Sequence, residues 1–181
     1  DMDKNCARAS LIEAGICTIE SHPAAAINAY RQVGKQDPDY LPEVTGPLFE
    51  CYREIGKLDE YRDYLHEVVA TIGGITPLLC LTDLTEELEG RDAAVHYLAS
   101  ELDRRPAVRG VHRLVEYALA SAEGDMQRSL YTIRQMTERL IQGKSVYKCK
   151  QCGFAAKNLH WQCPGCKCWN SIKPVFGVEG E

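Results

Sequence analysis

The chain has 181 residues, a hydrophobic fraction of 45% and a formal net charge of −5. This size and composition suit one large domain, or a large domain with a small one, around a real hydrophobic core. No run of 18 apolar residues is present, so we expect neither a membrane-spanning helix nor a signal peptide in this segment. Because the sequence opens in what reads as the approach to a helix, we expect the chain to be a piece of a longer protein.

Residues 4–142 are predicted to be helical throughout, and turn signals recur among them at a fixed period. Gly56, Gly90 and Gly124 are spaced 34 residues apart, and each lies between two helix-like stretches. Glycine takes the left-handed conformation of a helix-ending turn at little cost. One period earlier, Ser21 followed by Pro23 predicts a helix cap and a first helical turn. The pattern therefore predicts four helical hairpins.

Apolar residues at helical spacing supply the faces that these hairpins would bury. The first three hairpins are separated by Pro38 and by the break at residues 72–77, and the third ends at Pro106. The expected core residues are Ala14, Cys17, Ala26, Tyr30 and Val33 in the first hairpin, Leu48, Phe49, Tyr52, Tyr61, Leu65 and Val68 in the second, and Leu130, Ile133 and Met136 in the fourth.

Four helical hairpins at a 34-residue period resemble tetratricopeptide (TPR) repeats. An ordinary helical bundle is the alternative, but a bundle would not need glycine turns at a fixed period. We therefore predict an all-α fold, in which a TPR-like solenoid of residues 1–142 leaves a concave groove. Residues 141–145 break the helical pattern, so we place the domain boundary there and expect a small metal-binding module over residues 143–181.

Charge is unevenly distributed between these two parts. Residues 144–173 contain six lysines and no acidic residue, whereas the first 143 residues have a net charge of −9. An acidic helical body joined to a basic module is expected to dock against it through complementary charge.

Two cysteine pairs, Cys149 with Cys152 and Cys163 with Cys166, lie ten residues apart in the basic segment. Four thiolates at this spacing are typical of a tetrahedral metal site, and they favour it over disulfides. An all-sulfur ligand set indicates one zinc or iron ion, and the spacing does not separate the two. Paired thiols together with scattered free cysteines favour a reducing, cytosolic compartment.

The sequence around the first cysteine pair is repeated around the second pair. Tyr147 precedes Cys149 as Trp161 precedes Cys163, at a shift of 14 residues. Alternation along a short strand puts each ring on the side of the cysteine two residues later, where it can shield the site from water. Gly153, together with Pro164 and Gly165 of the second pair, is expected to let backbone N–H groups turn toward the sulfurs.

Other residues near the pairs are interpreted as bystanders. Cys168 forms a Cys-x-Cys arrangement with Cys166, so we interpret it as a nearby thiol outside the ligand set. His160 is expected to be a surface or packing residue. Trp161 and Trp169 are expected to be core rings of the module, with base stacking as the alternative.

Residues 147–154 and 160–166 look like a shortened pair of rubredoxin-type metal knuckles, here following TPR-like repeats. This combination resembles the lipopolysaccharide assembly protein B family of Gram-negative bacteria, as do residues 42–44, 50–56, 89–94 and 169–174. The resemblance covers nearly the whole chain. It implies Cys149, Cys152, Cys163 and Cys166 as the metal ligands, whereas Cys168 departs from the family's pattern.

The same resemblance implies a function. Members of the family are adaptors at the cytoplasmic face of the inner membrane, held there by an N-terminal transmembrane helix that this segment lacks. They promote degradation of the deacetylase that commits cells to lipid A synthesis by the membrane AAA+ protease, and they are linked to lipopolysaccharide assembly proteins. The residues that contact these partners, direct binding of lipopolysaccharide and homo-oligomerisation are left open.

From the residues alone, a non-enzymatic adaptor or scaffold is favoured, because we recognise no phosphate-binding loop, nucleophile motif or clustered acid pair of the catalytic kind. A rubredoxin-like electron carrier with iron in the four-cysteine site is the first alternative, although a TPR body is an unusual attachment for one. A zinc-ribbon protein that binds nucleic acid is the second alternative. The acidic charge of the whole chain argues against it, so we expect no nucleic-acid partner.

Overall fold

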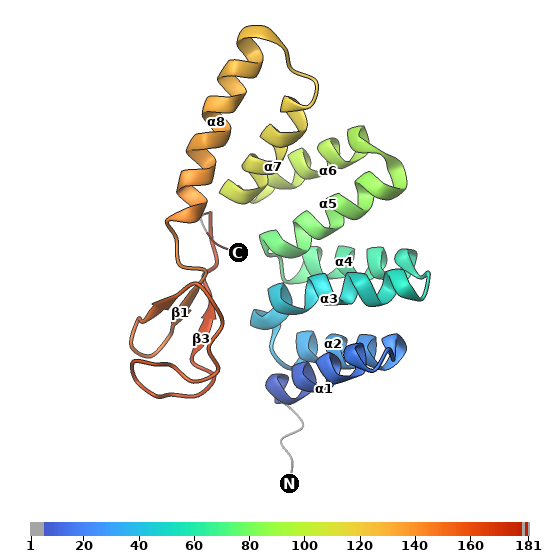
Figure 1. Cartoon of the computed structure of the whole chain (residues 1–181), viewed down its shortest axis with the longest axis vertical. Helices are drawn as coiled ribbons and strands as arrows, with labels where there is room; N and C mark the ends of the chain where they lie inside the picture. The colour runs from blue at the N-terminus through green and yellow to red at the C-terminus, as the bar shows by residue number, and fades with distance from the viewer. Residues whose placement is uncertain (1–5, 179, 181) are drawn as a thin grey trace. The chain divides into compact units, whose positions relative to one another are not determined.

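The computed structural model describes residues 6–178 and residue 180, and within them the chain is helical until a small C-terminal sheet (Figure 1). Eight α-helices, one short 3₁₀ helix and three strands are present in these residues. Their bounds are α1 Ala7–Ile19, α2 Pro23–Gln36, η1 Pro38–Tyr40, α3 Leu41–Glu54, α4 Leu58–Thr71, α5 Ile75–Glu89, α6 Arg91–Arg104, α7 Val108–Leu119, α8 Gly124–Gln142, β1 Tyr147–Cys149, β2 Ala155–Ala156 and β3 Ile172–Pro174.

The chain divides into two compact units, Asp1–Cys80 and Leu81–Glu181, and α5 runs across the division. In the first unit α1 packs on α2, α2 on α3 and α3 on α4, and in the second α6 packs on α7 and α7 on α8. The predicted fold class, helical hairpins followed by a small four-cysteine module, is confirmed. The assignment of the hairpins as TPR repeats stays a prediction, as does the boundary after residue 142, where helix gives way to strand between Gln142 and Tyr147.

The three periodic glycines adopt the predicted conformation. Gly56, Gly90 and Gly124 have φ angles of 69°, 95° and 60°, and each lies at the junction between two helices. At the first junction the prediction of a serine cap was wrong. Ser21 itself takes the left-handed conformation, with φ of 57°, and His22 precedes Pro23 of α2 without a side-chain capping bond. The serine thus replaces the glycine of the later turns rather than capping the helix.

Tyrosines dominate the core of the first unit. Tyr40, Tyr52 and Tyr61 are almost completely buried, and the rings of Tyr52 and Tyr61 are 5.4 Å apart between centroids. Their burial raises the pKa of the Tyr40 and Tyr61 hydroxyls. Other predicted core residues that are buried in this unit are Ala14, Ala26, Tyr30, Val33, Leu48, Leu65 and Val68.

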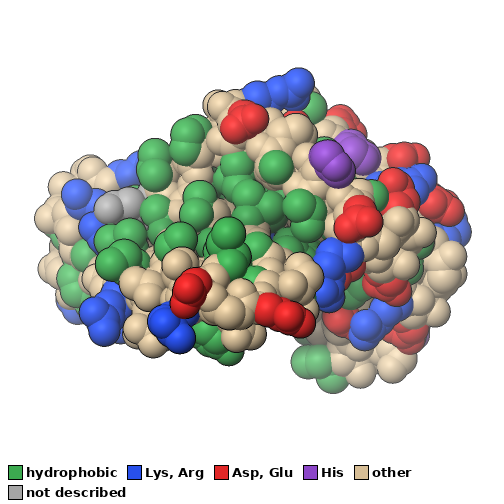
Figure 2. Space-filling view, turned by 90° about the horizontal axis from the view of Figure 1, so that it is seen from above, with side chains coloured by type: hydrophobic (Ala, Val, Ile, Leu, Met, Phe, Trp, Pro, Cys, Tyr) green, Lys and Arg blue, Asp and Glu red, His purple; other side chains and the backbone are tan. Residues whose placement is uncertain are grey.

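The apolar residues predicted for the core of the fourth hairpin are more exposed than those of the first unit. Ile133 and Met136 on α8 are 42% and 59% exposed, and Met126 and Leu140 are exposed with them. The buried residue on α8 is Thr137, whose hydroxyl lies 2.7 Å from Nδ1 of His112 on α7. Figure 2 shows a face of the molecule on which hydrophobic side chains gather. The prediction that Ile133 and Met136 are core residues was therefore wrong, whereas Leu130 is half-buried.

The segment after β3 makes backbone hydrogen bonds both to the residue before β1 and to a helix of the same unit. Val175 N–H donates to the carbonyl of Val146, 2.9 Å away, and Val108 N–H at the start of α7 donates to the carbonyl of Val178, 2.8 Å away. The segment after β3 is therefore bonded to α7. None of the described helices has both the length and the apolar character needed to cross a membrane.

Candidate metal centre

The centre is built on a three-stranded antiparallel sheet with the order β2-β1-β3. The central strand β1 pairs with β3 in a register that sets Tyr147 opposite Pro174, Lys148 opposite Lys173 and Cys149 opposite Ile172. Side chains alternate between the two faces of a strand. Tyr147 and Cys149 therefore share one face, on which both are buried.

The first cysteine pair lies in a tight turn. Cys149 N–H donates to the carbonyl of Phe154 at 2.7 Å, and Gly153 N–H donates back to the carbonyl of Cys149 at 3.0 Å. Gly153 takes a φ of 76°, which a glycine adopts without strain. The turn brings the N–H of Gln151 to 3.4 Å from the Cys149 sulfur.

The second pair repeats this turn at the same 14-residue shift that the sequence shows. Cys163 N–H donates to the carbonyl of Cys168, and Lys167 N–H donates to the carbonyl of Cys163, both at 2.9 Å. Lys167 occupies the place of Gly153 and also has a positive φ, 62°. A Cβ atom at Gly165 would lie 3.4 and 3.8 Å from the sulfurs of Cys152 and Cys163, which are ordinary van der Waals distances. Gly165 therefore lies directly beside the cysteine sulfurs.

The four predicted ligand sulfurs converge. The Sγ atoms of Cys149, Cys152, Cys163 and Cys166 all lie within 4.8 Å of one another. Cys149 and Cys166 are 3.8 Å apart, and Cys152 and Cys163 are 3.6 Å apart. A tetrahedron with metal–sulfur bonds of about 2.3 Å has sulfur–sulfur edges of about 3.8 Å. The residues therefore fit a single metal ion held by four thiolates.

The electrostatic setting favours a thiolate at Cys149. Its sulfur lies 3.4 Å from the Ser171 hydroxyl, and this contact, followed by the backbone N–H of Cys152, lowers the pKa of the Cys149 thiol to about 6. At Cys152 and Cys166, backbone N–H groups of Phe154 and Cys168 act in the same direction, but desolvation and the neighbouring sulfurs outweigh them and the pKa is raised. Sequence reasoning missed Ser171, because no spacing rule links it to a cysteine pair.

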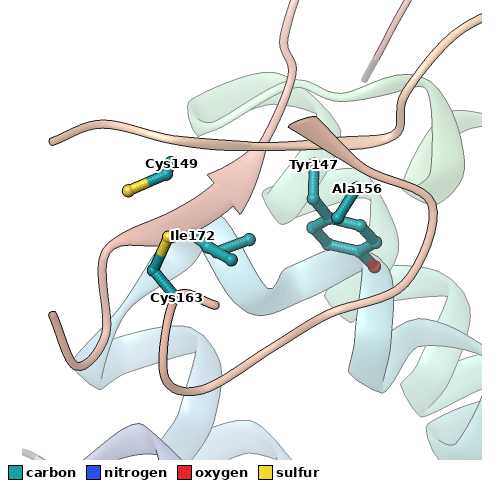
Figure 3. Close-up of a cluster of buried hydrophobic side chains, with 5 residues drawn as sticks. All are labelled: Tyr147, Cys149, Ala156, Cys163 and Ile172. Atoms are coloured by element: carbon teal, nitrogen blue, oxygen red, sulfur yellow. The ribbon is translucent and has the colours of Figure 1, made fainter. Parts of the chain in front are cut away.

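Part of the predicted aromatic shield is present. Tyr147, Cys149, Ala156, Cys163 and Ile172 form a buried cluster (Figure 3). The two cysteines lie at one end of this cluster, and Tyr147 lies beside Ala156 at the other. Trp161, the counterpart of Tyr147, is only half-buried.

The prediction that Trp169 is a core ring of the module was wrong, because its side chain is 61% exposed. Trp169 pairs with Gln162 in an isolated bridge outside the three strands. The buried cluster is completed instead by the smaller side chains of Ala156 and Ile172.

Cys168 and His160, which we interpreted as residues outside the ligand set, are not among the four converging cysteines of the described residues. Cys168 is half-buried, and its sulfur does not belong to the group of mutually close sulfurs. The ring of His160 meets the ring of Phe154 edge-on at 6.5 Å between centroids. This contact agrees with a packing role for His160.

Comparison with known proteins identifies the family. Residues 147–174 match the sequence family described as the rubredoxin metal binding domain. Over 179 residues, 98% of the chain, the sequence is 35% identical to lipopolysaccharide assembly protein B of Escherichia coli (strain K12), and over 175 residues, 96% of the chain, it is 34% identical to the protein of that name from Haemophilus influenzae. The chain belongs to the lipopolysaccharide assembly protein B family.

The match to this family includes the helices as well as the metal module, because the aligned part is nearly the whole chain. The chain spans about half the length of these relatives, 46% of the Escherichia coli protein and 44% of the Haemophilus influenzae protein.

Proposed function

We propose that the chain is part of a non-enzymatic adaptor in lipopolysaccharide assembly. The observation that carries the proposal is the family match over 98% of the chain, which joins helical hairpins and a four-thiolate module in one sequence. In this role the hairpins present surfaces to protein partners. The four cysteines all serve as ligands, and a closed four-cysteine site has no open position for a substrate.

In its finer form, the proposal is that the adaptor promotes degradation of the deacetylase that commits cells to lipid A synthesis. The membrane AAA+ protease would be the degrading enzyme, lipopolysaccharide assembly proteins would be further partners, and the site of action would be the cytoplasmic side of the inner membrane. The resemblance described above supports these partners and this location.

Within the adaptor, the metal module would stabilise its own segment of the chain and the start of α7 to which that segment is bonded. One ion would be bound by Cys149, Cys152, Cys163 and Cys166, and this ion supplies the folding free energy of a segment too small to form a sufficient core. β3 depends on pairing with β1 beside Cys149, and the segment after β3 is bonded to the start of α7. Loss of the ion is therefore expected to loosen the structure as far as α7.

The experiment is to measure the half-life of the deacetylase after translation is blocked, in cells whose own copy of the gene carries Cys149→Ser. We expect the half-life to lengthen, and we expect Cys168→Ser, a cysteine outside the ligand set, to leave it unchanged. Equal half-lives for wild type and a Cys149→Ser protein shown to have lost its metal would overturn the proposal.

A measurement on the purified protein tests the alternative function, that of an electron carrier. In an electron carrier the visible absorbance of bound iron would change reversibly on reduction, and a physiological donor would reduce it. A zinc-loaded protein that sustains rapid turnover of the deacetylase would favour the adaptor over this alternative.

A further inference from the structure

A cleft lined by three lysines lies beside the metal centre. It has a volume of about 440 Å³, and Lys148, Lys150 and Lys173 line it together with Gly153 and Pro174. We call it the basic cleft. The adaptor function proposed above does not involve the basic cleft. The volume of the cleft is within the range of about 300–1,000 Å³ that is typical of small-molecule sites.

The sheet register brings two of these charges together. Lys148 on β1 is directly opposite Lys173 on β3, and Cβ atoms of directly opposed residues are about 4.5–5.5 Å apart. Like charges in this relationship destabilise a sheet. Lys173 itself is largely buried, so its charge lies close to the sheet. An anion in the cleft would relieve the repulsion between the two lysines.

The metal centre accounts for only part of this positive charge. A divalent ion with four thiolates has a net charge of −2, whereas residues 144–173 contain six lysines and no acidic residue. Four positive charges remain after the centre is counted. Lys148 and Lys150 flank Cys149 in sequence and contribute to this balance, and the positive charge that remains would attract a further anion.

We propose that the basic cleft binds a phosphate group, either of a soluble phosphate compound or of a phospholipid headgroup. Ammonium groups bind phosphate as point charges through short charge-assisted hydrogen bonds. Lys150 and Lys173 take part in further interactions, and an ammonium has three donors, so each can keep such a contact and still reach a phosphate oxygen. The inference does not depend on the adaptor function.

The test uses the whole metal-loaded chain and two probes. Inorganic pyrophosphate represents the soluble source, and vesicles of phosphatidylglycerol, compared with vesicles of phosphatidylcholine, represent the lipid source. Binding is measured at constant ionic strength, set with chloride, so that general screening is the same in every sample. We expect saturable binding of one probe, and the probe that binds identifies the source of the phosphate.

The decisive variant is Lys148→Gln with Lys150→Gln, because both side chains are exposed and the fold should tolerate the change. We expect the dissociation constant to rise about tenfold or more, since hydrogen bonds to charged groups are lost. The matched control, Lys144→Gln with Lys157→Gln, removes the same charge from outside the cleft and should change binding less than threefold. Metal content is measured in all three proteins to show that the module stays folded.

Three results would overturn the proposal. The first is binding of neither probe to the wild-type chain. The second is an equal loss of binding in both double variants, which would indicate general attraction to a basic module. The third is loss of metal without loss of phosphate binding in the cleft variant, which would assign the lysines to the charge balance of the metal centre alone.

Discussion

The hydroxyl of Tyr61 on α4 donates a hydrogen bond to the backbone carbonyl of Thr45 on α3, 2.7 Å away, in a completely buried environment. Thr45 in turn donates its own hydroxyl to the carbonyl of Leu41 at 2.6 Å. The first bond joins α4 to α3, and the second joins two successive turns of α3. Tyr61 therefore contributes to this core through its hydroxyl as well as through its ring.

Replacing Tyr61 with phenylalanine should lower the free energy of unfolding by about 1 kcal/mol, because one buried hydrogen bond is lost while the ring contacts remain. Chemical denaturation of the metal-loaded chain measures this change. The matched control is Tyr131→Phe, since Tyr131 on α8 is half exposed and should change stability by less than about 0.5 kcal/mol. Equal effects of the two substitutions would contradict the assigned role.

Two helical glycines should respond to alanine in opposite directions. A Cβ atom at Gly110 on α7 would lie 2.4 Å from Cδ2 of the Leu102 side chain on α6, so Gly110→Ala should destabilise the chain by about 1–3 kcal/mol through overpacking. At Gly15 on α1 nothing lies within 4 Å, and Gly15→Ala should stabilise it by about 0.5–1 kcal/mol. Thermal unfolding measures both, and stabilisation by Gly110→Ala would show that α6 and α7 do not pack this closely.

Tyr117 and Glu86 should make the stability of the second unit depend on pH. The Tyr117 hydroxyl donates to Oε2 of Glu86 at 2.9 Å. This bond is the main cause that lowers the pKa of Glu86 below its usual 4.5, and desolvation followed by the same bond raises the pKa of Tyr117 to about 12. The contribution of Glu86 is thus present above pH 4.5 and lost as the pH falls through its folded-state pKa. That of Tyr117 is present below pH 10 and lost as the pH rises toward 12.

Tyr117→Phe should therefore lower stability by about 1 kcal/mol at neutral pH, and the difference from wild type should shrink as the pH falls below 4.5. The unfolding temperature of both proteins, followed from pH 3 to pH 7, measures it. Tyr97→Phe is the control, because burial raises the pKa of Tyr97 without a contact to Glu86, and its difference from wild type should be constant over this range. A constant difference for Tyr117→Phe as well would exclude the coupling.

Removal of the metal should unfold the module and spare most of the helices. A chelator, or Cys149→Ser, should abolish the one equivalent of metal, because one of four sulfurs within 4.8 Å of one another is lost. Structural zinc contributes about 10–16 kcal/mol to folding in small modules, so residues 147–174 should lose protection from hydrogen exchange while α1–α4 keep theirs. Cys168→Ser should retain the metal, and loss of metal in that variant would instead make Cys168 a ligand.

The positions of the hairpins could be predicted from particular residues. Gly56, Gly90 and Gly124 predicted the turns because left-handed backbone is rarely adopted by other residues. The cysteine spacing predicted the convergence of four sulfurs, since a Cys-x-x-Cys turn gives two sulfurs little freedom to point elsewhere. Ser21 shows the limit of such rules, because its residue type indicated a cap while the local turn required a positive φ.

The sequence by itself determined most of the helices, the three glycine turns and the four candidate metal ligands of this protein, because these depend on neighbours within a few residues along the chain. Only the tertiary structure decided that Ser171 contacts the Cys149 sulfur, that Trp169 is exposed, and that Lys148 and Lys173 meet across two strands. Each of these relationships joins residues about 20 or more positions apart, or depends on which face of a strand is covered. Strand register and side-chain burial set them, and no local pattern encodes either.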